Sequence, residues 1–281
     1  MKFGLAISGK ADLKLLERMA LRAEELGYDS FLVTDHFLLP DSNSHLDVWS
    51  FLPYLAAKTK KIRLGTCVTP IPFRHPAILA KSISTCDILS SGRIILGAGV
   101  GWYRPEFEGF STWLDTKDRF AYTKEGLEIM LRLWTENAPF NYDGKFIHVK
   151  GAIVEPKPIQ KPHPPIWLGG HLPGSLRMAG KYAQGWMPIG PRWFGEGYPK
   201  PEQYSEMRKI IIQELKKNKI SEKDFTFTNL ISPAPDIKTV RSDVEQYIEA
   251  GMNYFILGEK AQSEKSLQTI EIVAKEIGQS L

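Results

Sequence analysis

Three glycines at alternate positions, Gly97, Gly99 and Gly101, close an apolar run near the middle of this 281-residue chain. Because glycine has no side chain, such a segment lets its backbone come close to another group. The glycines belong to the stretch from Arg63 to Glu106, whose pattern predicts a strand, a proline-interrupted bend, an amphipathic helix and a second strand. A bound ring system is the natural candidate for the group that this backbone approaches.

Short buried runs alternate with helical periodicity along the whole chain. The predicted strands cover residues 3–7, 30–34, 62–68, 94–96, 165–168, 186–189, 225–231 and 254–257. The eight repeats predict an α/β fold, a (β/α)8 TIM barrel with an excursion at 136–165 after the fourth helix, as a single domain over 1–281. A doubly wound open sheet is the alternative, but the first strand lacks the G-x-G-x-x-G exit that a dinucleotide fold requires.

Composition narrows the class of protein. The 43% hydrophobic and 24% charged residues are typical of a globular protein. No run of about 18 apolar residues predicts a membrane span, and the five-residue apolar run at the start is too short for a signal peptide. Two cysteines suggest neither a disulfide framework nor a zinc site, and the net charge of +4 comes from scattered Lys and Arg. We therefore expect a cytoplasmic protein that binds neither nucleic acid nor membrane.

In a barrel, the functional residues lie where strands end and helices begin. This rule collects candidates at Ser8, 35–36, 67–69, 99–102, 169–171, 188–193, Ser232 and 258–259. They contain no G-x-S-x-G or H-E-x-x-H motif, so an ordinary hydrolase is not indicated. Asp35, His36 and Glu106 could hold a metal in principle, but barrel metal sites usually use more His, and we expect none.

Four motifs in order resemble the luciferase-like monooxygenase superfamily, and specifically its branch that uses the deazaflavin coenzyme F420. They are TDHF at 34–37, GTCVTPIPFRHPAILAK at 65–81, SGRIILGAGVGW at 91–102 and PPIWLGGHLPGSLRMAGKYAQGW at 164–186. The resemblance covers nearly the whole chain, and the four motifs together are much more specific than any one alone.

The resemblance implies a flavin-type ring against the inner barrel wall. By position, a non-proline cis peptide at Cys67–Val68 would support one face of the ring, near Gly101; the alternative is that both are ordinary inward residues. Asp35 and His36 match the Asp-His pair of the deazaflavin branch, beside the polar edge of the ring. There, an imidazole with a pKa near 6.5 could exchange a proton during hydride transfer. In the alternative interpretation, Asp35 caps the next segment and His36 only packs.

The remaining site residues also follow from the resemblance. Gly169 and Gly170 match the turn that receives the coenzyme phosphate, with a helix N-terminus aimed at it; a tight turn without ligand is the alternative. Glu106 matches a carboxylate position. Trp102 stands where some relatives have an acidic catalytic residue, which leaves the proton donor open.

The substrate side is expected at Trp102 and in the irregular segment 190–200, which has the pattern of a mobile loop over a site. Arg192 and Trp193 are its candidates, with a solvated loop as the alternative. Arg74 is expected to anchor the bulge loop.

The resulting hypothesis is an oxidoreductase that transfers a hydride between coenzyme F420 and an unidentified small organic substrate. One alternative is a monooxygenase of the same fold that uses reduced FMN. The other is a barrel that has lost its coenzyme. Relatives commonly form dimers, so a homodimer is a possible assembly.

Overall fold

Eight parallel strands form a closed barrel in the computed structural model, which describes residues 1–8, 12–40, 42, 44–193, 195, 197–261 and 263–278. Hydrogen-bonded neighbours follow the order β3-β2-β1-β11-β10-β9-β8-β5, and β5 closes the ring by pairing with β3. The strands are β1 (Lys2–Ser8), β2 (Ser30–Val33), β3 (Arg63–Thr66), β5 (Ile94–Gly99), β8 (Ile166–Gly169), β9 (Gly185–Met187), β10 (Thr226–Ile231) and β11 (Tyr254–Lys260). The predicted (β/α)8 barrel is confirmed.

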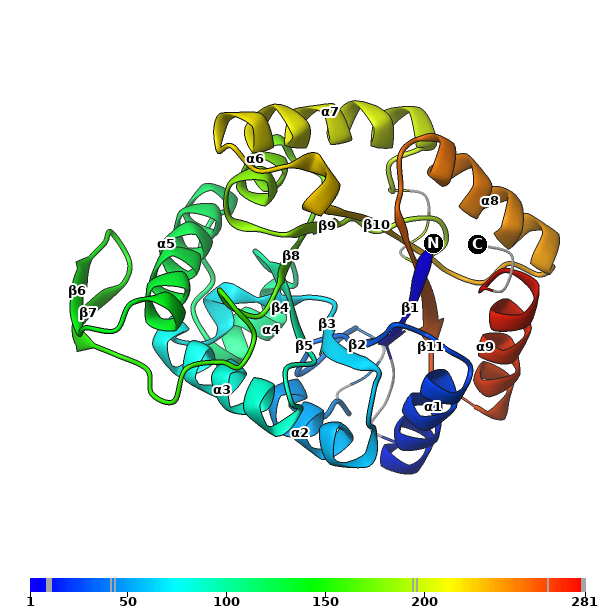
Figure 1. Ribbon diagram of the computed structural model, residues 1–281, viewed down its shortest axis with the longest axis horizontal. Helices are drawn as coiled ribbons and strands as arrows, with labels where there is room; N and C mark the ends of the chain where they lie inside the picture. Colours follow the sequence, from blue (N-terminus) through cyan, green and yellow to red (C-terminus); the bar gives the residue numbers. More distant parts are fainter. Residues whose placement is uncertain are drawn as a thin grey trace.

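The helices surround the strands (Figure 1). They are α1 (Leu13–Glu25), α2 (Val48–Lys58), α3 (Pro76–Leu89), α4 (Arg104–Phe110), α5 (Thr116–Thr135), α6 (Pro173–Tyr182), α7 (Pro201–Lys217), α8 (Ile237–Glu249) and α9 (Glu264–Glu276), with short 3-10 turns at Ile71–Phe73 and Glu222–Asp224. The excursion after α5 contains the antiparallel hairpin β6 (Phe140–Asp143) and β7 (His148–Ala152), which projects from the barrel. Helix α4 was not predicted.

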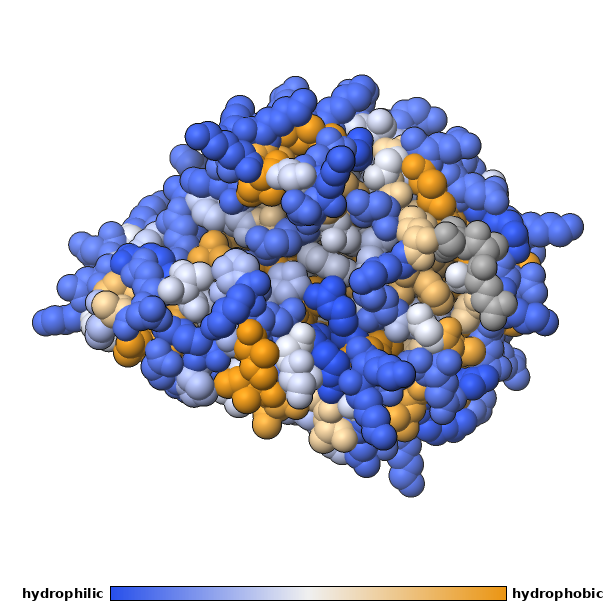
Figure 2. Space-filling model, in the orientation of Figure 1, coloured by the Kyte–Doolittle hydropathy of each residue, from blue (hydrophilic) through white to orange (hydrophobic). Residues whose placement is uncertain are grey.

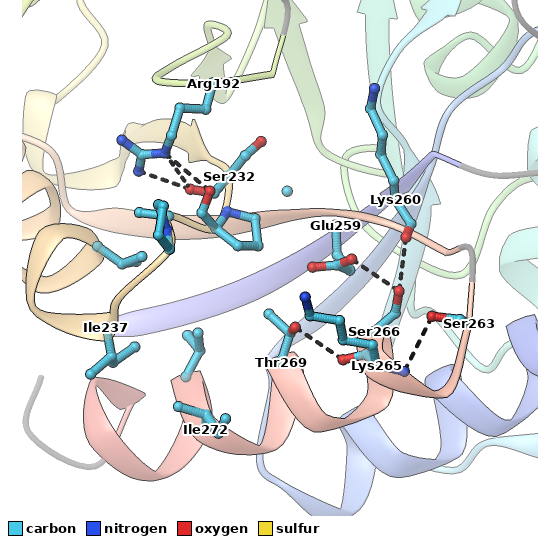
Figure 3. Close-up of a pocket in the computed structure, with 16 residues that line it drawn as sticks. Arg192, Ser232, Ile237, Glu259, Lys260, Ser263, Lys265, Ser266, Thr269 and Ile272 are labelled. Carbon is cyan, nitrogen blue, oxygen red and sulfur yellow. Dashed lines mark hydrogen bonds between the residues drawn. The ribbon is translucent and has the colours of Figure 1, made fainter.

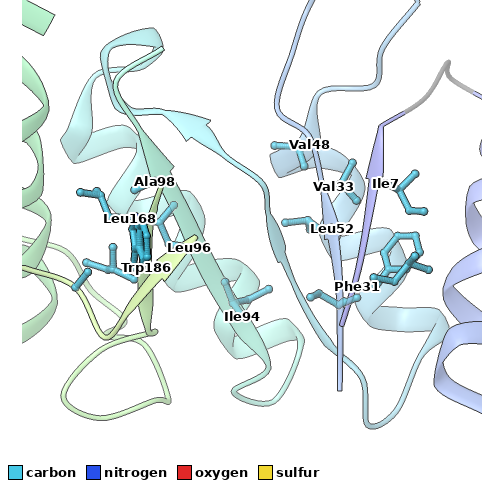
Figure 4. Packing of buried hydrophobic residues seen from close by; sticks show 14 of the residues in the cluster. Ile7, Phe31, Val33, Val48, Leu52, Ile94, Leu96, Ala98, Leu168 and Trp186 are labelled. Carbon is cyan, nitrogen blue, oxygen red and sulfur yellow. The ribbon is translucent and has the colours of Figure 1, made fainter. Parts of the chain in front are cut away.

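Alternation along the strands separates the two sides of the barrel wall. Leu32 and Ile95 belong to a small cluster inside the ring, whereas Phe31 and Leu96, one position away, belong to the large core shared with the helices (Figure 4). Successive side chains on a strand point to opposite faces, and parallel strands covered by helices are apolar on both. The continuous apolar runs in the sequence therefore form two cores, and the inner one is the floor of the functional end of the barrel.

The face of the molecule seen in Figure 2 is mainly hydrophilic, with hydrophobic side chains in separate patches. Among the helices of the described segments, none combines the length and the apolar character that crossing a membrane would require.

Candidate active site

A cavity of about 100 Å³ opens at the carboxyl ends of the strands; we call it the barrel-mouth cavity. Parallel strands bring their carboxyl ends to one face, so residues far apart in sequence meet there. Its lining contains His36, Cys67, Val68, Gly101, Trp102, Gly169, Gly170 and Trp193 of the predicted site residues, together with Thr34, Pro70, Met187, Pro188, Ile189 and Leu230. Asp35, Glu106 and Arg192 are not in this lining.

One wall of the cavity is the kink between β3 and β4 (Thr69–Pro70). The Cys67–Val68 peptide bond at the kink is cis, as expected from the resemblance. Burial raises the pKa of the Cys67 thiol to about 12, so this sulfur is a neutral wall atom rather than a nucleophile. The described residues contain no group of three or more His, Cys, Asp or Glu side chains arranged to hold a metal ion.

The glycines of β5 make room for this kink. A Cβ on Gly99 would lie 2.5 Å from Val68 Cγ2, and one on Gly97 would lie 1.8 Å from the Thr66 carbonyl oxygen. The group that the backbone approaches at these two positions is therefore the neighbouring strand. This corrects the interpretation that a bound ring explains both glycines. Gly101, with φ +76, lines the cavity itself.

His36 is held from behind by Glu106. The Glu106 side chain is 1% exposed, and its Oε2 lies 2.9 Å from His36 Nδ1. Its other oxygen accepts hydrogen bonds from the backbone N–H groups of Phe37 and Leu38. A carboxylate has no hydrogen to donate. The hydrogen in the contact between Glu106 and His36 is therefore assigned to His36 Nδ1. The free lone pair is then on Nε2.

Helix α4 is the element that brings Glu106 back over the end of β2. Pro105 stands in its first turn with Glu106 beside it, a combination that favours a helix start because proline lacks a donor there and acids suit the N-terminus. This signal could have revealed the helix from the sequence. It places Glu106 behind the imidazole and not in the cavity lining.

Asp35 lies behind the wall, with 1% of its side chain exposed. It accepts two hydrogen bonds from Arg74, at 2.7 and 3.0 Å, and one from Thr69 Oγ1 at 2.8 Å. Burial raises the pKa of Asp35, while Arg74 and Thr69 act in the opposite direction. Arg74 also bonds Asp47 at 2.7 Å, at the start of α2. The arrangement ties β2, the kink and α2 together, the anchoring that was expected of Arg74.

The turn after β8 needs a glycine at position 170. Gly170 has φ +101, which favours glycine, and a Cβ there would lie 2.7 Å from Ser175 Oγ. Trp186 Nε1 donates to the Gly170 carbonyl at 2.7 Å and fixes the turn. Helix α6 begins at Pro173 without a side-chain hydrogen bond from its N-cap residue, Leu172. Its N-terminal N–H groups and positive dipole end therefore suit an anion.

Two tryptophans flank the entrance. Trp102 is 51% exposed, and its ring meets the His36 ring edge-on with centroids 6.1 Å apart. Trp193 is 7% exposed and packs into the inner barrel cluster. Arg192, next to it, turns away and forms an ion pair with Asp243 at 2.6 Å. Residues 194 and 196 of the predicted mobile loop lie outside the described residues.

A second and larger cavity, about 590 Å³, lies between α8 and α9 beyond the ends of β10 and β11. We call it the α8/α9 cavity (Figure 3). Arg192, Ser232 and Gly258 stand on its wall with Glu259. Burial raises the pKa of Glu259 to about 7. The Ser266 hydroxyl donates a hydrogen bond to Glu259 at 3.0 Å and acts in the opposite direction on this pKa. By size alone, the α8/α9 cavity would be the candidate active site. The His36 imidazole and the Cys67–Val68 kink, however, line the barrel-mouth cavity.

Comparisons with known proteins identify the family of this chain. The family model described as luciferase-like monooxygenase matches residues 1–279. An F420-dependent glucose-6-phosphate dehydrogenase of Microbacterium testaceum is 31% identical over 187 residues, 66% of this chain and 53% of that protein. An F420-dependent glucose-6-phosphate dehydrogenase of Kineococcus radiotolerans is 34% identical over 180 residues, which cover 61% of this chain and 51% of that protein. The chain spans about half the length of these curated relatives.

Solved structures share the fold. An F420-dependent secondary alcohol dehydrogenase in complex with an F420-acetone adduct has a TM-score of 0.83 and 20% identity, with 99% of both chains covered. The oxygenating constituent of 3,6-diketocamphane monooxygenase from Pseudomonas putida, in complex with FMN, has a TM-score of 0.78 and 16% identity, with 100% and 99% covered. With a family model that matches almost from end to end, this chain belongs to the luciferase-like monooxygenase family.

Proposed function

We propose that the protein is an oxidoreductase that transfers a hydride between the deazaflavin coenzyme F420 and a small organic substrate. The observation that carries the proposal is the barrel mouth itself. The Cys67–Val68 kink forms one wall of the cavity, and His36, held by Glu106, lines the same cavity. The F420-dependent names of the curated relatives support the choice of coenzyme.

The residues present fit such a coenzyme. Val68 packs between Gly99 and Gly169, where a Cβ would lie 2.5 and 3.1 Å from its methyl groups, so the apolar Val68 side chain is backed by two glycines. A flat ring could lie against it. The Gly170 turn and the start of α6 would receive a phosphate, since both offer backbone N–H groups to an anion.

Coenzyme F420 would supply the carbon that accepts or returns the hydride. The protein's part is to handle the proton and to exclude water. Because Glu106 accepts from Nδ1, Nε2 of His36 is the atom that can take the proton of a substrate hydroxyl, or give one to a carbonyl oxygen. The indole of Trp193 and the side chains of Met187 and Leu230 surround this place with apolar surface.

FMN remains the alternative coenzyme, because monooxygenases that bind it share the fold. The Asp35-His36 pair favours F420, since it resembles the deazaflavin branch. The two coenzymes imply different reactions: deazaflavin lacks the flavin N5 nitrogen and reacts poorly with oxygen.

Titration of the purified protein with F420 and with FMN, followed by coenzyme fluorescence, tests the proposal. We expect F420 to bind at least tenfold more tightly than FMN. Tighter binding of FMN would replace the proposal with the monooxygenase, and binding of neither would favour a barrel without a coenzyme. A His36→Asn variant should bind F420 within threefold of wild type but lose turnover, which separates coenzyme binding from proton transfer.

A further inference from the structure

The two cavities meet at Gly258. This residue lines the α8/α9 cavity, whereas Trp193 and Leu230 line the barrel-mouth cavity. A Cβ built on Gly258 would lie 2.3 Å from Leu230 Cδ2 and 2.7 Å from Trp193 Cε3. The indole therefore rests directly on the Gly258 backbone, between the place where substrate would react and the larger cavity beyond.

Arg192 holds the indole in this position. Its Nε donates to the carbonyl oxygens of Ser232 and Pro233, each at 3.1 Å, and its Nη2 donates to Ser232 at 2.8 Å (Figure 3). The same guanidinium pairs with Asp243 on α8. Arg192 has φ +67, a backbone conformation that non-glycine residues seldom adopt. With the arginine side chain fixed on the outer side, the next residue is directed into the barrel mouth.

The cavities differ in chemistry as well as in size. Among the described residues that line the barrel mouth, there is no Lys, Arg, Asp or Glu, and His36 is the one titratable side chain besides the buried Cys67 thiol. The α8/α9 cavity has Lys260 and Lys265 in its lining, with the hydroxyl groups of Ser263 and Thr269. Among the described residues that line the two cavities, Lys and Arg side chains occur only in the α8/α9 cavity, on the far side of Trp193.

We propose that Trp193 is the specificity-determining residue of the enzyme, and that by separating the barrel-mouth cavity from the α8/α9 cavity it selects compact, uncharged alcohols or the corresponding carbonyl compounds. This inference rests on the proposed function. In the reaction, His36 Nε2 would take the hydroxyl proton as the C=O bond forms, and bound F420 would supply the carbon that accepts the hydride of the broken carbinol C–H bond. The reverse reaction reduces the carbonyl compound.

Trp193→Ala and the control Trp193→Phe test the inference through their crystal structures and kinetics. In the alanine variant we expect one continuous cavity, and a rise of at least tenfold in the ratio of kcat/KM for glucose 6-phosphate to that for 2-propanol. The phenylalanine variant should keep the cavities separate and the ratio within threefold of wild type. Thermal unfolding establishes that both variants are folded.

Several results would overturn the inference. If the two cavities stay separate in the crystal structure of the alanine variant, Trp193 does not divide them. This result holds whether or not the protein binds F420. If wild type binds F420 but prefers glucose 6-phosphate, or oxidises none of a series of compact neutral alcohols, the substrate class is wrong. Failure of the proposed function looks different: F420 would not bind at all, while the crystal structures would still decide whether Trp193 divides the cavities.

Discussion

Two buried glutamates at the same face of the barrel are treated very differently by their surroundings. Glu106, behind the barrel mouth, accepts from His36 and from two backbone N–H groups. Glu259, in the α8/α9 cavity, accepts from the Ser266 hydroxyl, and burial raises its pKa to about 7. The first is a fixed acceptor that orients another group, and the second is an acid poised to change charge near neutral pH.

The difference between the two glutamates extends to the two cavities beside which they lie: the barrel-mouth cavity has the groups that a reaction needs, and the α8/α9 cavity is mainly larger. The smaller cavity, about 100 Å³, combines the imidazole that Glu106 holds, the Cys67–Val68 kink and the Gly169–Gly170 turn. The larger, about 590 Å³, has Glu259, Lys260 and Lys265 in its lining, but its described lining residues include no imidazole. Volume is thus a poor guide to chemistry here, and mutations should affect the two regions in different ways.

Replacing Glu106 should have the largest effect. Glu106→Ala removes the acceptor for His36 Nδ1 and for two backbone N–H groups, so the imidazole is free to rotate and to change tautomer. We expect kcat/KM for F420 reduction to fall by about 100- to 1000-fold, the typical contribution of a positioned acid or base. Initial rates over a range of substrate concentrations, from well below KM to saturation, measure it.

Glu106→Gln is the matched control, because it keeps the size and one acceptor oxygen. Its amide N–H group would donate to Nδ1, which moves the imidazole hydrogen to Nε2. The variant should therefore alter the pH profile of kcat/KM more than the stability. Activity of Glu106→Ala within tenfold of wild type would contradict the orienting role.

Asp35→Asn should mainly affect stability. It replaces a buried carboxylate that receives two Arg74 hydrogen bonds, and we expect a loss of about 2–3 kcal/mol in the free energy of unfolding. Urea denaturation at neutral pH measures this. Asp47→Asn is the control: this partner of Arg74 is 40% exposed, and its loss should cost under about 1 kcal/mol.

The same variant tests the sequence interpretation of Asp35. Because the side chain lies behind the wall, the dissociation constant for F420 should stay within threefold of wild type. A tenfold weaker affinity would return Asp35 to the edge of the coenzyme, where the resemblance put it.

Much of the fold was predictable because its signals are local. Each strand is a short apolar run, and the helical repeats between them follow a fixed period, so strand order and barrel class follow from pattern. The kink at Cys67–Val68 and the turn at Gly170 were found because short motifs carry them. Eight of the predicted site residues, including His36 and Trp102, line the barrel-mouth cavity.

The remainder depends on contacts between distant segments. Asp35 is drawn behind the wall by Arg74, 39 positions later, and no local pattern records this pairing. Trp193 lies in an aperiodic segment, and its inward position depends on the carbonyl groups that hold Arg192. Glu259 was collected only as a strand end, because its burial comes from helices that pack over β11.

Glu259→Gln should change how stability depends on pH. The pKa of Glu259 is raised in the folded protein, so the stability that its protonated form contributes is complete below the unfolded pKa and is lost as the pH rises through about 7. At pH 8 to 9 the variant should be more stable than wild type by about 3 kcal/mol, and the difference should vanish near pH 4. Urea denaturation across this range measures it.

Ser266→Ala sharpens this result. The Ser266 hydroxyl lowers the pKa of Glu259, so its removal should move the loss of stability to higher pH. Turnover should not follow the same profile, since Glu259 is outside the barrel mouth. Curves for wild type and Glu259→Gln that run parallel from pH 4 to 9 would show that Glu259 titrates normally.

Gly170→Ala should cost little stability but clearly weaken coenzyme binding. At φ +101 an alanine is strained, and its Cβ would press on Ser175 Oγ, which can rotate away, so we expect about 1 kcal/mol. Gly27→Ala is matched for backbone strain, with φ +82, but no heavy atom lies within 4 Å of its Cβ. Fluorescence titration should show F420 binding weakened at least tenfold in Gly170→Ala alone. Equal affinities in the two variants would mean that the turn after β8 matters for the fold and not for the phosphate.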